Sequence, residues 1–125
     1  MNKLIAEVKE IYSLERLNLI KFSLNFQIIN VLILEMNLDL KAGKKAELII
    51  KPTAISILNE KCEFENVLKG EIKEIKNGEI LSKIVVIVEG FELEAVMVKE
   101  KVNFKKDVFV VFKSNDVIIS KVLDD

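Results

Sequence analysis

The sequence contains no histidine, no tryptophan, one proline and a single cysteine among its 125 residues. Without histidine the chain lacks the imidazole base of serine and cysteine triads and the commonest side-chain ligand of zinc and haem iron. Cys62 has no second cysteine with which to form a disulfide, which is typical of proteins of the reducing cytoplasm. We therefore expect a cytoplasmic protein that is not an enzyme and that binds no metal by direct side-chain coordination.

The sequence also lacks an excess of charge of one sign and any long apolar run. It has 19 Lys and Arg against 20 Asp and Glu, so it does not carry the basic excess typical of nucleic-acid binders. Met1–Ile11 includes four charged residues, which disfavours a signal peptide. The longest apolar stretch, Ile28–Leu34, is interrupted by Asn30 and is too short to span a membrane. We expect neither a nucleic-acid partner nor membrane insertion.

The most informative feature that is present is an internal repeat. Asn2–Ile11 (NKLIAEVKEI) and Asn66–Ile75 (NVLKGEIKEI) share six of ten residues at a spacing of 64. Residues 46–58 (AELIIKPTAISIL) match residues 108–120 (VFVVFKSNDVIIS) at a spacing of 62. Because solenoids need about three or more repeats, a unit of this length that occurs twice indicates a duplicated domain. We predict two domains, residues 1–62 and 63–125.

Each half has the period-two pattern of half-buried strands. Leu68, Gly70 and Ile72 alternate with charged residues, and the segment Phe22–Phe26 alternates apolar with polar residues. The pair Asn77-Gly78 predicts a tight hairpin with positive φ angles, which would pair residues 72–75 with residues 80–88. Five short strands in each half predict an all-β fold of two tandem, small, OB-like five-stranded β-barrels.

Two predicted strands, Ile28–Leu34 and Ile84–Val88, are apolar on both faces, so their outer faces are expected to be covered as well. A domain of about 62 residues is also only marginally stable alone. Both observations predict a homo-oligomer or an intimately joined pair of domains.

Several segments resemble the molybdenum-pterin-binding (Mop) or TOBE domains, small OB-like domains that bind molybdate and tungstate. They are VLKGEIKEIKNGEILSKIVVIV from Val67, FELEAVMV from Phe91 and FVVFKSNDVII from Phe109. The first half, with NKLIAEVKEI and LDLKAGKKAELIIKPTAISI, is similar to the first half of tandem (di-Mop) members. The resemblance implies an intracellular protein that binds molybdate or tungstate at domain and subunit interfaces, for storage, homeostasis or transport.

The resemblance also implies which residues hold the oxyanion. A dianion with four acceptor oxygens needs several converging donors and a compensating positive charge. The family's Lys-Ser element and opening Asn correspond to Lys113, Ser114 and Asn66, and their counterparts in the first half are Lys51, Thr53 and Asn2. The alternative for each lysine is a solvated charge at a strand end, and for each asparagine a turn or strand-start residue.

Two positions depart from the family pattern. Glu65 stands where the family has an arginine before the opening Asn, and Val98 stands where it has a threonine. A carboxylate in place of a guanidinium reverses the charge offered to an anion. Residues 1–62 have 9 basic and 7 acidic residues, net +2, whereas residues 63–125 have 10 and 13, net −3. We therefore expect the lysines of the first half to contribute more to oxyanion binding.

Other functions stay open at this point. The fold could be kept without the ligand, as a structural or regulatory TOBE module that associates with a molybdate transporter component or a regulator. OB-like folds also bind single strands of nucleic acid or oligosaccharides, but such grooves need exposed aromatic residues and a basic track. For the oligomer, the resemblance favours a trimer over a dimer.

Overall fold

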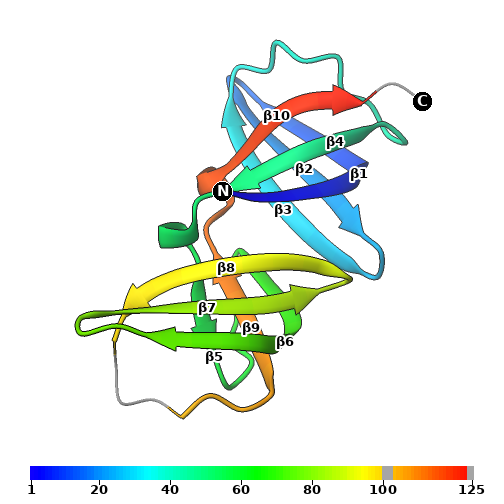
Figure 1. Ribbon diagram of the computed structural model, residues 1–125. Coiled ribbons are helices and arrows are strands. Elements are labelled where there is room, and N and C mark those ends of the chain that lie inside the picture. Colours follow the sequence, from blue (N-terminus) through cyan, green and yellow to red (C-terminus); the bar gives the residue numbers. More distant parts are fainter. Residues whose placement is uncertain (100–102, 124–125) are drawn as a thin grey trace.

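The computed structural model describes residues 1–99 and 103–123, which form two five-stranded antiparallel sheets (Figure 1). The first sheet comprises β1 (Asn2–Leu14), β2 (Leu17–Leu24), β3 (Gln27–Leu34), β4 (Lys45–Ile50) and β10 (Val117–Leu123), in the order β10-β4-β1-β2-β3. The second comprises β5 (Ser56–Leu58), β6 (Asn66–Asn77), β7 (Leu81–Val88), β8 (Phe91–Val98) and β9 (Asp107–Phe112), in the order β5-β9-β6-β7-β8. Two short 3-10 helices, η1 (Pro52–Ala54) and η2 (Ser114–Asp116), lie between β4 and β5 and between β9 and β10. The predicted all-β class with two five-stranded units is confirmed.

The sequence repeat reappears in the elements. β6, β7 and β8 begin 64 residues after β1, β2 and β3, and β9 and η2 begin 62 residues after β4 and η1. Each long first strand also carries an irregularity at the same place, between Val8 and Glu10 in β1 and between Ile72 and Glu74 in β6. Such bulges bend a strand and let a small sheet coil around its core.

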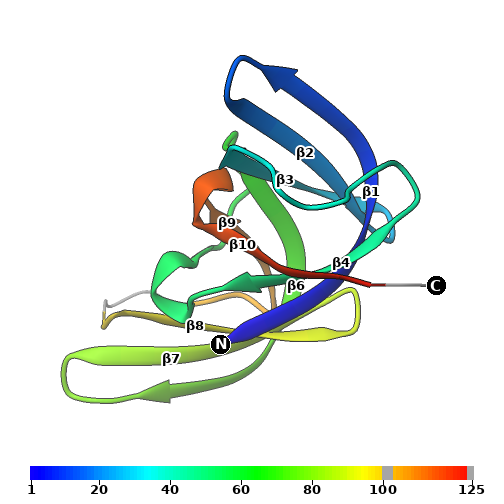
Figure 2. The ribbon, with the colours of Figure 1, turned by 90° about the horizontal axis from the view of Figure 1, so that it is seen from above.

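The two sheets exchange one strand each. β5, from the first half of the sequence, pairs with β9, while β10, from the second half, pairs with β4. Viewed from above, β10 runs alongside β4, which lies between it and β1 (Figure 2). The division at residue 62 therefore remains a prediction about duplicated sequence units, because neither sheet is built from one unit alone.

Two turn predictions need correction. The hairpin after Asn77 forms and pairs Ile72 with Val86 and Ile75 with Ile84, but neither Asn77 nor Gly78 has a positive φ. Instead, Gly78 N–H closes a three-residue loop by donating to the Leu81 carbonyl at 2.8 Å.

The alternation predicted through Phe26 ends two residues earlier, at Leu24. Asn25 turns the chain with a φ of 54°, and Phe26 is left fully exposed in the β2–β3 turn.

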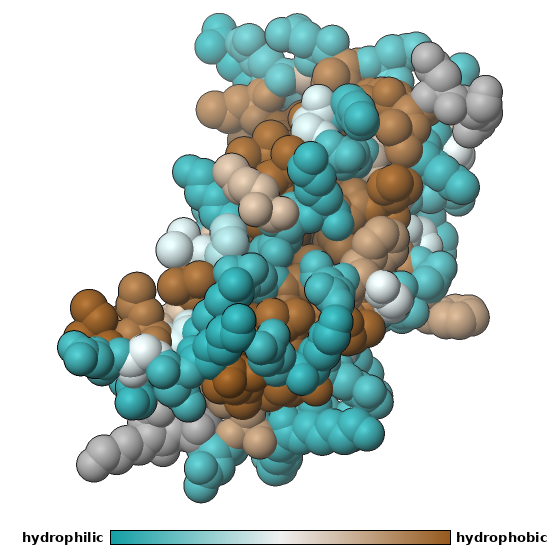
Figure 3. Space-filling model, in the orientation of Figure 1, coloured by the Kyte–Doolittle hydropathy of each residue, from teal (hydrophilic) through white to brown (hydrophobic). Residues whose placement is uncertain are grey.

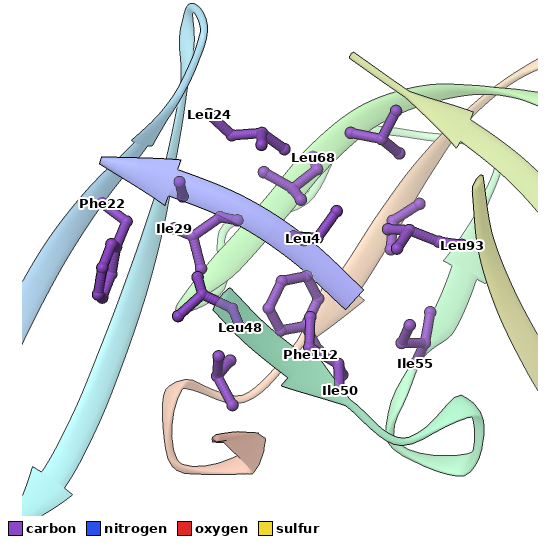
Figure 4. Packing of buried hydrophobic residues seen from close by; sticks show 14 of the residues in the cluster. Leu4, Phe22, Leu24, Ile29, Leu48, Ile50, Ile55, Leu68, Leu93 and Phe112 are labelled. Atoms are coloured by element: carbon purple, nitrogen blue, oxygen red, sulfur yellow. The ribbon is translucent and has the colours of Figure 1, made fainter. Parts of the chain in front are cut away.

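One apolar core joins the two sheets. Leu4 of β1, Leu68 of β6 and Phe112 of β9 are buried in the same cluster, and they lie together between the sheets (Figure 4). A small residue is required in β6, because a Cβ on Gly70 would lie 2.5 Å from Val86 Cγ1. The core thus holds the two sheets, and the turns between them, in fixed relative positions.

Candidate functional site

The predicted lysines occupy equivalent places where the chain crosses between the sheets. Lys51 precedes η1 and Lys113 precedes η2, each in an extended conformation with an exposed side chain. η1 lies against β8 and η2 against β3, so each turn packs on the edge strand of the opposite sheet. The fold thereby presents two related positive positions, one on each side of the boundary between the sheets.

The second of these positions, formed by Lys113 and Ser114 at the start of η2, already holds an anionic group. Glu65 Oε1 accepts two hydrogen bonds from Ser114, one from the backbone N–H at 2.8 Å and one from Oγ–H at 2.5 Å. Ser114 is only 5% exposed, so its donors face the carboxylate and not open solvent. These hydrogen bonds, from the side chain and then the backbone of Ser114, hold the pKa of Glu65 below its ordinary value, and the nearby Lys113 lowers it further.

The first position, formed by Lys51 and the residues of η1, offers different hydrogen-bonding groups. The spacing of 62 places Pro52 where the second half has Ser114, and proline has neither a backbone N–H nor a hydroxyl. Lys51 and Thr53 are exposed, and within residues 1–99 and 103–123 no hydrogen bond joins either of them to a carboxylate. This position therefore offers a free ammonium and hydroxyl but lacks the paired donors of Ser114.

The two predicted asparagines connect one sheet to the other. Asn66 Oδ1 accepts from Asn30 N–H at 2.6 Å while its Nδ2 donates to the Asn30 carbonyl at 2.9 Å. Asn2 does the same with Glu94, with distances of 2.8 and 2.9 Å. Both asparagines are buried, and each pairs with the outer edge of β3 or β8 as a neighbouring strand would. One N–H of each amide group remains beyond these bonds.

Further polar residues near Ser114 and Asn66 were not predicted from the sequence. Asn30 donates from Nδ2 to the Glu65 carbonyl at 2.8 Å and accepts at Oδ1 from Lys21 Nζ at 2.9 Å. Asn30 is the residue that interrupts the apolar run of β3, and it lies 64 positions before Glu94. The polar residues Asn30 and Glu94 at equivalent positions of two largely apolar strands were the signal that could have identified this pair.

Val98, the second departure from the family pattern, lies at the end of β8. It is exposed, four residues beyond Glu94, and borders a cavity of about 650 Å³ with Ile75 and Phe104. A second cleft, of about 620 Å³, is bordered by Glu65, Lys61, Lys69 and Phe64. The structure therefore brings Lys113, Ser114 and Asn66 together near Glu65 and leaves Val98 elsewhere.

Within the described part of the chain, no group of three or more Cys, Asp and Glu side chains is arranged to hold a metal ion. None of the helices in that part has the length and apolar character needed to cross a bilayer.

Comparison with known proteins gives a structural match only. No family model and no curated protein matches the sequence significantly. The fold is similar to a crystal structure of the cytoplasmic molybdate-binding protein ModG with molybdate bound, with a TM-score of 0.86. The match covers 96% of this chain and 95% of that chain at 17% sequence identity. At that identity the similarity establishes a shared fold over nearly the whole length of both chains.

Proposed function

We propose that this protein binds molybdate or tungstate reversibly, without chemical conversion, and serves in the storage, homeostasis or transport of the oxyanion. The observation that carries the proposal is the Lys113–Ser114 element. Its backbone N–H and hydroxyl converge on one carboxylate oxygen beside an ammonium group. This donor set suits an anion oxygen. The likeness to a molybdate-binding protein over almost the full chain supports the same function.

The proposed ligands are Lys51, Thr53 and Asn2 at the first position and Lys113, Ser114 and Asn66 at the second. Each asparagine would contribute the amide N–H that is not used in pairing the sheets. Glu65 already accepts both hydrogen bonds of Ser114 at the second position, so the first position is expected to bind a dianion more readily. Residues Lys51 and Thr53 are therefore expected to contribute most in the unmodified chain.

Equilibrium dialysis against molybdate and tungstate, with bound metal counted per chain, tests this function. A ligand at 100 times its dissociation constant should stabilise the fold by about 2.7 kcal/mol, which a melting curve detects. Lys51→Gln should weaken binding, whereas Lys41→Gln, which removes an exposed lysine from the β3–β4 loop, should not. Fewer than about one metal per several chains at saturation, with no melting shift, would contradict the proposal.

We also propose a homo-oligomer, with a trimer favoured over a dimer. Each sheet ends in an exposed apolar row, Leu14, Leu17 and Leu34 in the first and Ile80, Leu81 and Val98 in the second. Figure 3 shows apolar side chains gathered over the tip of the β6–β7 hairpin, at the lower left. Such rows support association with further copies. Light scattering with and without molybdate measures the mass, and a monomer in both states would contradict the proposal.

A second candidate function is a structural or regulatory module that binds no oxyanion and associates with a molybdate transporter component or regulator. It is favoured by one specific observation, that both Ser114 donors are already taken by Glu65. The dialysis experiment separates the two functions, because this candidate requires no retained metal. A cytoplasmic location belongs to both proposals, and cell fractionation tests it.

A further inference from the structure

We propose that the Glu65 carboxylate is a built-in occupant of the Lys113–Ser114 oxyanion position and keeps that position closed to free oxyanions. Because this inference concerns regulation of the proposed oxyanion site, it rests on the proposed function. The first position would then bind an oxyanion directly, whereas the second would bind one only after Glu65 is displaced.

The contact leaves no donor of Ser114 free. Its N–H and Oγ–H both point at the same Glu65 oxygen, at 2.8 and 2.5 Å. What remains on Ser114 are the lone pairs of its hydroxyl, which repel an anion. Lys113 lies close enough to lower the pKa of Glu65, so its positive charge is already partly compensated. An arriving oxyanion must therefore remove the carboxylate before it can use either residue.

The carboxylate is held in place through its own backbone. The next residue, Asn66, begins β6, is 1% exposed and pairs with Asn30. The Glu65 carbonyl accepts a further hydrogen bond from Asn30 Nδ2 at 2.8 Å. A group tethered this closely acts at an effective concentration of at least about millimolar. Free oxyanion in the micromolar range competes poorly against it.

The first half has no equivalent of this contact. The spacing of 64 places Met1 where the second half has Glu65, and Pro52 stands where it has Ser114. Neither the carboxylate nor the paired donors are present there. The closed position is thus specific to the second half, where the chain departs from the pattern of the family it resembles.

The experiment compares molybdate binding by the full-length protein and three variants. Glu65→Ala removes the occupant, Glu63→Ala removes the same charge from a neighbouring exposed residue, and Glu65→Ala with Ser114→Ala removes the donors as well. Equilibrium dialysis should show one additional molybdate per chain, or at least about tenfold tighter binding, for Glu65→Ala alone. The Glu63→Ala variant should match the wild type, and the double variant should lose the gain.

The outcomes separate this inference from the proposed function. If the wild type binds molybdate and Glu65→Ala gains nothing over Glu63→Ala, the inference is wrong and the function stands. If only Glu65→Ala binds, the inference stands and the function of the unmodified chain is wrong. If no variant binds, both are wrong.

A measurement on the wild type covers the case in which Glu65→Ala does not fold. The amide resonance of Ser114, followed by NMR, should not move at molybdate concentrations that saturate the first position. A shift of that resonance together with those of the first position would overturn the inference.

Discussion

At the scale of single residues, Glu65 couples stability to pH. Hydrogen bonds from Ser114 lower its pKa in the folded protein below the ordinary value of 4.5. A carboxyl group with a depressed folded-state pKa contributes stability above its unfolded pKa, and this contribution is lost as the pH falls through the folded pKa. The contact therefore stabilises the fold at neutral pH and stops doing so in acid.

The expected result is a difference between variants that shrinks with acid. At neutral pH Glu65→Ala should melt below the wild type, and below pH 4.5 the two melting temperatures should converge. Thermal melts at a series of pH values measure this. Glu63→Ala serves as the control and should run parallel to the wild type, while a constant offset for Glu65→Ala at every pH would show that the contact does not depend on ionisation.

Gly70 is a residue whose size is fixed by its neighbours. A Cβ at this position would lie 2.5 Å from Val86 Cγ1 and 2.9 Å from the Ile87 carbonyl oxygen, closer than real Cβ atoms approach. Gly70→Ala should therefore destabilise the protein by about 1–3 kcal/mol through overpacking. Urea unfolding measures the change.

Ala6, at the equivalent position of β1, accommodates its methyl group, so Ala6→Gly should cost only about 1 kcal/mol. Equal stability of Gly70→Ala and the wild type would contradict the close packing.

At the scale of elements, side-chain amides complete the edges of the sheets. β3 and β8 are edge strands, and an unpaired edge exposes backbone groups that invite other strands. Asn66 and Asn2 satisfy one residue on each edge. In the opposite sense, the side chain of Gln27 in β3 pairs with the backbone of Lys69 in the inner strand β6, at 2.7 and 3.1 Å. Three amide groups thus join the sheets where no strand can.

Removing one of these side-chain amides should lower the free energy of unfolding. Asn66→Ala leaves the N–H and carbonyl of Asn30 without their partners, for which the expected loss is about 1–3 kcal/mol. Asn66→Asp keeps an acceptor for the N–H but loses the donor to the carbonyl, so it should not restore stability. Chemical unfolding of both variants tests this, with Asn37→Ala, at an exposed residue of the β3–β4 loop, as the control. A loss for Asn66→Ala no larger than the control's would show that water replaces the amide.

Local patterns in the sequence predicted most of the strands but not how the sheets are completed. Apolar alternation placed Leu68 and Ile72 in a strand, and the repeat predicted two units. Alternation cannot show which sheet contains a short strand, because the apolar pattern of β5 or β10 would be the same in either sheet. The contact of Glu65 with Ser114 joins residues 49 positions apart and follows from that topology. The repeat, by contrast, matched Lys51 to Lys113, and their role as ligands, which only the family resemblance implies, stays a prediction.

At the scale of the whole molecule, the two halves keep a matched hydrogen bond at positions where their residues differ. Ser13 Oγ donates to Asn18 Oδ1 in the first half, and Ser82 Oγ donates to Asn77 Oδ1 in the second. Asn77 and Ser82 lie 64 positions after Ser13 and Asn18, so the serine and the asparagine have exchanged places. The hydrogen bond survives although both residues differ. If the two halves arose by the predicted duplication, a unit that keeps such a contact is free to differ at its turns, as Pro52 and Ser114 do.

The strand exchange makes the two halves dependent on each other. Residues 1–62 would lack β10, leaving the edge of β4 open, and β5 would have no β9 on which to pair. Residues 63–125 would lack β5, and the shared core around Leu4 and Phe112 would be exposed in both fragments. We expect neither fragment to fold cooperatively alone, because such a short chain is only marginally stable even with a complete sheet.

Mixing the two fragments in equal amounts should restore a cooperative melt and the amide spectrum of the intact protein. Thermal melts and two-dimensional NMR of each fragment and of the mixture measure this. A cooperative transition of residues 1–62 alone, close to that of the intact chain, would show instead that the first half is an independent domain and that the exchanged strands add little.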